Sequence, residues 1–143
     1  MPKKKDRSFS LVEVLVVLAI ITSMVSITVM RPVGNFYYDV VRVKNSLSYA
    51  YNTAFTIGRN VKIYYFQDSN KIEFKAGSKK LLEYTLKYSE ITNYPYFKNM
   101  EFKSVGTVTP TGMIVLKDKI RKRHYVQIYV SLFGSIRVNE VVY

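Results

Sequence analysis

The chain has no cysteine and only one histidine, and these shortages exclude several kinds of site. Without cysteine there can be no disulfide, no thiolate metal site and no cysteine nucleophile. The sequence also lacks a Gly-rich phosphate loop, an H-E-x-x-H array and a pair of acids suited to acid–base catalysis. His124 follows a run of cations that would oppose its protonation, so we expect a solvent-exposed loop histidine. We therefore expect a protein that is not an enzyme and that uses no metal and no cofactor.

Acidic residues are also scarce, with 10 Asp and Glu against 22 Lys and Arg, for a formal net charge of +12. Residues 1–8 hold four basic residues and one acid, so without them the charge is still +9. The excess of positive charge therefore belongs to the rest of the chain. It favours anionic partners such as nucleic acid, phospholipid headgroups or acidic wall polymers, and does not choose among them.

One long apolar run extends from Leu11 to Met30. It has the roughly 20 residues that a helix needs to cross about 30 Å of hydrocarbon. The basic residues in Met1–Ser8 predict that this end stays in the cytoplasm and that the remainder is exported. A cleaved secretory signal would need a shorter apolar core and an A-x-A-like site, which residues 21–26 imitate only weakly. The sequence predicts a single-pass protein of the cytoplasmic (inner) membrane with a periplasmic or extracellular head.

Glu13 lies inside this apolar run. An unpaired acid near the middle of a bilayer costs roughly 2.5–3.5 kcal/mol on insertion scales, and less near a helix end. A plain membrane anchor does not need such a residue. The carboxylate therefore requires a partner.

The segment from Arg7 to Glu13, with its short basic leader and apolar continuation, resembles the class III signal of type IV pilins and type II secretion pseudopilins. The resemblance implies cleavage by prepilin peptidase between Ser8 and Phe9, followed by N-methylation of Phe9. It also implies that Glu13 pairs with the free N-terminal amine of a neighbouring subunit in a filament of pilins or pseudopilins. This chain has Ser8 where the family usually has Gly.

Beyond the apolar run, Pro32 and Gly34 interrupt the helical pattern. A helix then resumes, and Gly58 is expected to end it. Its apolar residues recur three or four positions apart and should form one buried stripe. They are Val40, Val43, Leu47, Ala50, Ala54 and Ile57.

The remainder predicts a β-rich head. Two β-prone runs, 61–66 and 71–75, are joined by a four-residue hairpin loop, and a third run follows at 81–87. Residues 88–100 look irregular, and strands resume at 113–116, 125–130 and 135–138. We expect an α+β fold with five to seven strands, in which a long N-terminal helix packs on a C-terminal antiparallel β-sheet head. The predicted divisions are a leader at 1–8, a transmembrane and assembly helix at 9–30, a soluble helical half at 31–58 and a head at 59–143.

The order of these segments, with glycines near 106, 112 and 134, resembles the H-type minor pseudopilins and the FimT-like minor pilins. Those proteins pack two β-sheets against the C-terminal half of the long helix. Another pilin subfamily, including the minor pilins of competence systems, is the alternative. The resemblance implies a non-catalytic subunit that starts or caps a filament serving secretion, adhesion or DNA uptake.

A cluster of cations between two predicted strands is the remaining candidate site, with tyrosines at 125 and 129 on the next strand. Basic side chains could neutralise phosphates while exposed rings stack on bases, so an alternative function is the capture of extracellular DNA. The competing interpretation is a solvated hairpin whose charges protect the sheet edge and whose tyrosines are core. Some FimT-like pilins bind DNA through a Gly-Arg-x-Arg motif, which Gly134–Arg137 matches except at Ser135. The candidate DNA-binding residues are Lys117, Lys119, Arg121, Lys122, Arg123 and Arg137.

Overall fold

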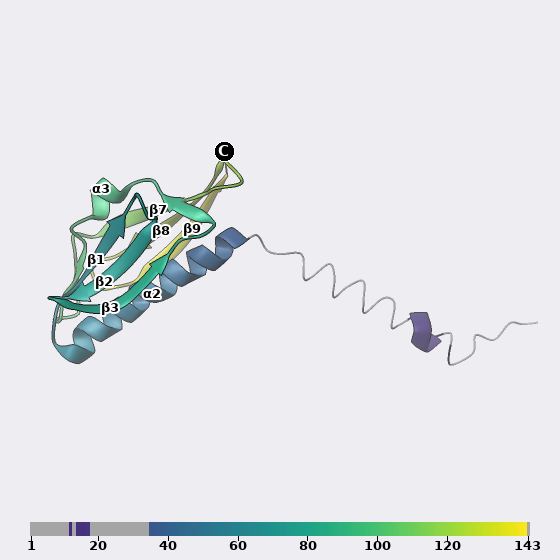
Figure 1. Ribbon diagram of the computed structural model, residues 1–143. Coiled ribbons are helices and arrows are strands. Elements are labelled where there is room, and N and C mark those ends of the chain that lie inside the picture. The colour runs from purple at the N-terminus through teal and green to yellow at the C-terminus, as the bar shows by residue number, and fades with distance from the viewer. Residues whose placement is uncertain (1–11, 13, 18–34, 143) are drawn as a thin grey trace, which may run out of the picture. The chain divides into compact units, whose positions relative to one another are not determined.

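The structure is a computed structural model that describes residue 12, residues 14–17 and residues 35–142 (Figure 1). The chain divides into two compact units, Met1–Gly34 and Asn35–Tyr143. In the first unit, residue 12 and residues 14–17 are helical, whereas Ser8, Phe9 and Glu13 lie outside the described residues. Most of the predicted membrane segment at 9–30 and the predicted break near Pro32 also lie outside them. No helix among the described residues is both long and apolar enough to cross a membrane.

Helix α2, Asn35–Ile57, carries the predicted apolar stripe. Five of the six predicted positions are buried, together with Phe36, Asp39 and Ser46. Ile57 is the exception and remains 44% exposed, because it is the last helical residue beside the turn at Gly58. The predicted end of the helix at Gly58 is confirmed: its φ is 63°, and the next amide, Arg59 N–H, donates to the carbonyl of Ala54 at 3.2 Å.

The first sheet contains five antiparallel strands in the order β3-β2-β1-β5-β6. The predicted hairpin is confirmed, with residues 67–70 joining its two strands, and Asn70 adopts φ 50° at the end of the loop. The Asn70 side chain accepts a hydrogen bond from Tyr65 Oη at 2.6 Å and donates to the carbonyls of Leu86 and Ser89. The strands are β1 Val61–Phe66, β2 Lys71–Ala76, β3 Lys79–Thr85, β5 Glu101–Phe102 and β6 Val108–Thr109.

The second sheet contains four antiparallel strands in the order β4-β7-β8-β9. Along β7 and β8 alternate residues are buried, so one face of this sheet points into the head and the other points outward. β9 is an edge strand. The strands are β4 Ser89–Ile91, β7 Gly112–Asp118, β8 His124–Val130 and β9 Ile136–Val142.

The structure corrects two sequence predictions. The segment predicted to be irregular contains β4 and the short helix α3, Tyr94–Phe97. The described residues form nine strands instead of five to seven, since β4, β5 and β6 were not predicted. These strands have only two or three residues, too few to show the alternation that identifies a strand.

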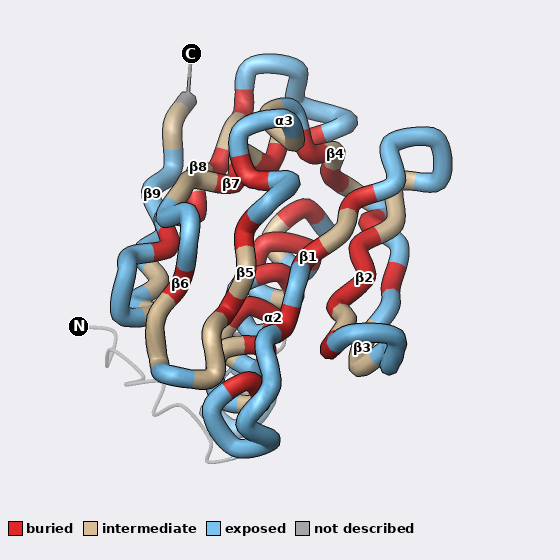
Figure 2. The backbone as a smooth tube through the Cα atoms, turned by 90° about the vertical axis from the view of Figure 1, so that its left-hand side faces the viewer, coloured by how far each residue is buried: buried red, intermediate tan, exposed pale blue. Residues whose placement is uncertain are grey.

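The core lies where the buried stripe of α2 meets the inner faces of the sheets (Figure 2). Val43 and Leu47 of the helix are fully buried, as are Phe74 and Phe102 in the first sheet and Ile128 in the second. Complete burial of each such side chain contributes roughly 1.5–3 kcal/mol. The predicted α+β fold, a helix packed against antiparallel sheets, is confirmed for this unit.

Candidate functional site

The basic hairpin, residues 117–124, joins β7 to β8 and carries five of the six candidate DNA-binding cations. Two of the five are already engaged within the fold. Lys117 lies on β7, and its Nζ is 3.2 Å from Glu90 Oε1 on β4. Lys119 Nζ donates to the carbonyls of Leu86 and Lys87, each at 3.3 Å. These two residues therefore attach the hairpin to β4 and to the segment that links β3 to β4.

The other three cations, Arg121, Lys122 and Arg123, are exposed at the tip of the basic hairpin. Within the described part of the chain, none of them forms an ion pair. They line a surface hollow of about 330 Å³ together with His124 and Glu140. The tip is thus a compact positive surface with space for an anionic group.

His124 is buried at 4% exposure as the first residue of β8, so the prediction of a solvated loop histidine is wrong. Its Nε2 is 2.5 Å from Glu140 Oε1 on β9, and its Nδ1 is 3.4 Å from Asp118 Oδ2 at the end of β7. Two aromatic rings from the first turn of α2 pack against the imidazole, Phe36 at 4.8 Å and Tyr37 at 5.8 Å between ring centroids. We call these five residues the His124 cluster.

The pKa shifts of the His124 cluster follow from its hydrogen bonds. Tyr37 Oη donates to Glu140, and this bond, followed by the one from His124, lowers the pKa of the Glu140 carboxyl. The same bond to Glu140, with a further contribution from burial, raises the pKa of Tyr37 to about 12. Burial alone would raise the pKa of Asp118, but hydrogen bonds donated by the Ile120 and Arg121 amides, and the contact with His124, outweigh it and lower that pKa.

This arrangement fastens elements together. Both ring nitrogens of His124 face carboxylates, so neither is positioned to take a proton from a nucleophile. Asp118 and Glu140 lie on opposite sides of the ring and do not converge on one point. Among the described residues no group of His, Asp and Glu could hold a metal ion. The His124 cluster joins the start of α2 to β7, β8 and β9.

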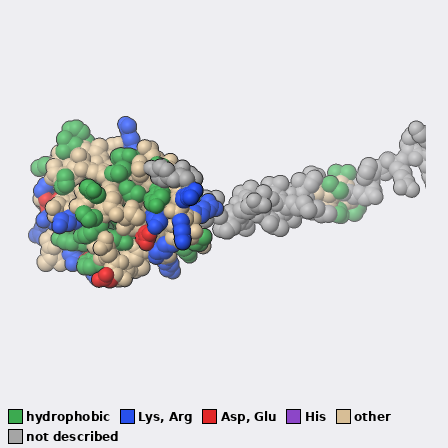
Figure 3. All heavy atoms as spheres, turned by 90° about the horizontal axis from the view of Figure 1, so that it is seen from above, with side chains coloured by type: hydrophobic (Ala, Val, Ile, Leu, Met, Phe, Trp, Pro, Cys, Tyr) green, Lys and Arg blue, Asp and Glu red, His purple; other side chains and the backbone are tan. Residues whose placement is uncertain are grey.

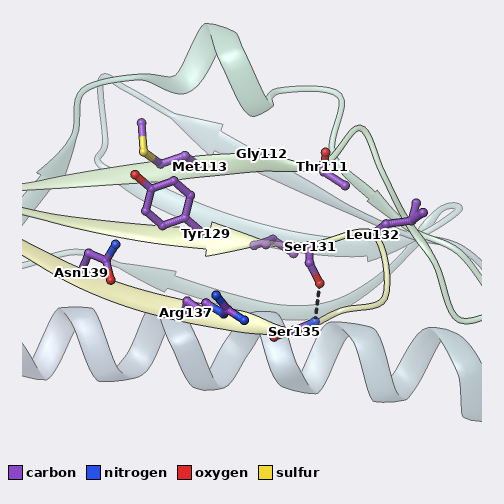
Figure 4. A pocket seen from close by; sticks show the side chains of 10 residues that line it. Thr111, Gly112, Met113, Tyr129, Ser131, Leu132, Ser135, Arg137 and Asn139 are labelled. Atoms are coloured by element: carbon purple, nitrogen blue, oxygen red, sulfur yellow. Dashed lines mark hydrogen bonds between the residues drawn. The ribbon is translucent and has the colours of Figure 1, made fainter.

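Arg137 belongs to a separate surface. It lies on the outward face of β9 opposite Tyr129, in a groove of about 830 Å³ across the second sheet (Figure 4). Val142, the β9 residue opposite His124, is five positions further along the strand, a separation of roughly 17 Å. The structure therefore does not bring Arg137 together with the basic hairpin.

The two tyrosines that follow the hairpin lie on this outward face. Tyr129 is 38% exposed and donates to Gln127 Oε1 at 2.7 Å, while Tyr125 is half-buried. They do not belong to the buried core, which contradicts the interpretation of these rings as core residues. Ser135, which replaces the first Arg of the motif, lies in the turn before β9, and its amide donates to Ser131 Oγ at 3.0 Å.

Two comparisons with known proteins bear on this chain. The model of the prokaryotic N-terminal methylation motif matches residues 3–29. The structure is similar to that of the minor pseudopilin EpsH from the type 2 secretion system of Vibrio cholerae, with a TM-score of 0.59 and 15% sequence identity. That match covers 74% of this chain and 97% of the other chain. The head of this chain has a pilin-like fold. A comparison with curated protein sequences found no match.

The resemblance to type IV pilins and to the fold of H-type pseudopilins is thereby confirmed. Ser8, Phe9 and Glu13 fall within the matched residues 3–29. The basic hairpin and the groove around Arg137 fall outside that motif. Sequence reasoning missed Tyr37, Asp118 and Glu140, because their roles arise only when distant segments meet at His124.

Proposed function

We propose that this pilin-like protein is a non-catalytic subunit of a membrane-rooted filament, a type IV pilus or a secretion or competence pseudopilus. Prepilin peptidase removes residues 1–8 between Ser8 and Phe9, and Phe9 is then methylated. The chain enters the filament through residues 9–30, and Glu13 pairs with the N-terminal amine of a neighbouring subunit.

One observation carries this proposal. The methylation motif at residues 3–29 is followed within a few residues by α2, whose buried stripe is built into a two-sheet head with the fold of a minor pseudopilin. As a filament subunit, this head functions through the surface that it exposes on the filament, and this function requires no catalytic group. The subunit starts or caps the filament, in keeping with the minor subunits that it resembles.

Processing provides the test. The full chain is produced with active prepilin peptidase, extracted from membranes and examined by intact-mass analysis. We expect loss of Met1–Ser8 and gain of one methyl group on Phe9. A Ser8→Gly variant is the matched control for the unusual residue before the cut, and an inactive peptidase should leave both chains whole. If active peptidase cleaves the Ser8→Gly variant and leaves the natural chain whole, processing between Ser8 and Phe9 does not occur in this protein.

Capture of DNA by the head is the second candidate function. The observation that favours it is the pairing of an exposed aromatic ring, Tyr129, with Arg137 across the outward face of β8 and β9. Binding of a single-stranded oligonucleotide by the detergent-solubilised chain should weaken as salt rises. An Arg137→Gln variant that binds equally well would remove this groove as the site.

A further inference from the structure

The basic hairpin and the start of α2 lie at the same end of the head (Figure 1). The His124 cluster holds them together, since Phe36 and Tyr37 of the first helical turn pack on His124 at the base of the hairpin. The link between β3 and β4 completes this end: Lys119 N–H donates to the carbonyl of Tyr88, and Lys87 and Tyr88 line a surface hollow with Asn35.

Positive charge is concentrated at this end of the head (Figure 3). Its exposed cations are Lys87, Lys119, Arg121, Lys122 and Arg123. The acids beside the hairpin, Asp118, Glu140 and Glu90, offset this charge only in part, because they are three against these five cations and Lys117. In the middle of the tip, Ile120 is 79% exposed. Clustered cations are attracted to anionic headgroups, and an exposed apolar side chain among them adds apolar area that such a surface can bury.

The chain also brings this end close to a lipid surface. Met30 ends the apolar run, and Asn35 begins α2 five positions later. Five extended residues reach at most about 18 Å. The end of the head that carries the basic hairpin therefore cannot move far from the membrane while the apolar run spans it.

We propose that the basic hairpin docks on anionic phospholipid headgroups of the membrane in which the same chain is anchored, before the subunit enters a filament. Arg121, Lys122 and Arg123 bind headgroup phosphates, and Ile120 enters the boundary between headgroups and acyl chains. The proposal rests on the membrane anchoring in the proposed function. It gives the unassembled subunit a fixed orientation on the membrane, with the outward groove at Arg137 free.

Lipid fits the tip better than nucleic acid does. A single strand of DNA is bound by cations combined with aromatic rings on which the bases stack. The tip offers an aliphatic residue instead: Tyr125, the second residue of β8, is half-buried opposite Lys117, and Tyr129 lies four positions further along the strand, opposite Arg137.

The experiment uses the absence of tryptophan from the chain, which allows one reporter residue to be introduced. The full chain carrying Ile120→Trp is reconstituted in liposomes of pure phosphatidylcholine or of phosphatidylcholine mixed with phosphatidylglycerol. Val105→Trp is the matched control: Val105 is also 79% exposed, but it precedes Gly106, whose carbonyl accepts a hydrogen bond from Tyr51 in the C-terminal half of α2. Tyr51 lies about 21 Å along the helix from Tyr37.

In anionic liposomes we expect the fluorescence emission of the Trp at position 120 to shift to shorter wavelength and to be quenched by brominated lipid. Added salt should reverse both effects. The Trp at position 105 should show neither effect. Each basic residue near an anionic surface strengthens binding roughly fivefold, so changing Arg121, Lys122 and Arg123 together to Gln should lower the docked-to-undocked ratio on the order of a hundredfold. The charge-preserving triple Arg121→Lys, Lys122→Arg and Arg123→Lys should dock like the parent.

Flotation with liposomes in the same samples tests anchoring separately, because the triple Gln variant must still float if residues 9–30 hold the chain. Equal quenching at positions 105 and 120, or an unchanged triple Gln variant, would overturn the docking proposal while leaving the anchor in place. A response of the position-120 Trp to an oligonucleotide in detergent, with none to anionic liposomes, would overturn it in favour of DNA. Loss of flotation by the parent would instead overturn the anchoring itself.

Discussion

At the scale of single residues, the environment of His124 in the fold differs from the one that its neighbours in the sequence suggest. In the sequence it follows four cations within a six-residue run, whereas in the structure it is buried between two carboxylates. Glu140 is 16 positions later in the chain, and Tyr37, which donates to Glu140, is 103 positions before that glutamate. Local charge predicted a solvated histidine because periodicity and spacing carry no information about contacts at such separations.

The His124 cluster leads to a prediction about pH. The pKa values of Asp118 and Glu140 are held below their ordinary values of 3.8 and 4.5, so at low pH the unfolded chain binds more protons than the folded chain. The stability that they contribute is present above those ordinary values and is lost as pH falls through the lowered ones. We expect the unfolding temperature of the full chain in detergent to drop below about pH 4.5. Glu140→Gln should flatten this drop, measured by circular dichroism between pH 3 and 7.

Gln keeps the size of Glu140 and can still accept from Tyr37, so the comparison isolates the titrating charge. Glu83→Gln is a suitable control, since Glu83 is a carboxylate of the other sheet whose pKa is also lowered, there by Lys80. Glu83→Gln should change how the unfolding temperature depends on pH at low pH, but it should leave the attachment of α2 to the basic hairpin unchanged. Identical pH profiles for the Glu140 variant and the parent would contradict the role given to this carboxylate.

At the scale of elements, the sequence predicted the helices and strands that are long enough to show a local pattern of apolar residues. The apolar stripe of α2 has a helical period, and the β1–β2 hairpin joins two β-prone runs through four residues, so both were located correctly. β5 and β6 have two residues each and exist because β5 pairs with β1 and then with β6. Such strands are defined by their partners, which no local pattern reveals.

Asp39 shows how α2 is held against the sheets by a polar contact as well as an apolar one. It is fully buried, and its Oδ2 accepts three hydrogen bonds, from Tyr88 N–H at 2.8 Å and from Ser89 N–H and Oγ at 2.9 Å each. The helix is thereby joined to the chain just before β4. A sequence with one acid in an apolar stripe gives no sign of these donors.

We expect Asp39→Ala to destabilise the fold by roughly 2–4 kcal/mol, because it leaves two backbone donors and a hydroxyl without an acceptor. Ser89→Ala removes only the hydroxyl donor and should cost about 1 kcal/mol. The measurement is urea unfolding of the full chain in a mild detergent, followed by the tyrosine signal in the near-ultraviolet. Equal effects of the two substitutions would show that the backbone donors find other partners.

At the scale of the whole molecule, the chain combines an apolar N-terminal segment with a β-rich head, and a charged group needs different partners in each. In the head, burial and hydrogen bonds within one chain are sufficient, as the His124 cluster and Asp39 show. The apolar run Leu11–Met30 itself contains no cation that could pair with Glu13. In the proposed function Glu13 pairs with the N-terminal amine of a neighbouring subunit, and this pairing predicts that the residue serves assembly.

Changing Glu13 should therefore separate membrane insertion from assembly. Glu13→Ala removes the cost of placing a carboxylate in hydrocarbon, so insertion should be unchanged or improved, measured by carbonate-resistant membrane association. Incorporation into filaments, measured in sheared filament fractions, should fall at least tenfold because the charge that pairs with the neighbouring amine is gone. Val12→Ala truncates the adjacent side chain without touching charge and should assemble like the parent. If the Glu13 variant were found in filaments as often as the Val12 variant, the carboxylate would have no part in pairing subunits, and its presence in the apolar run would need a different partner.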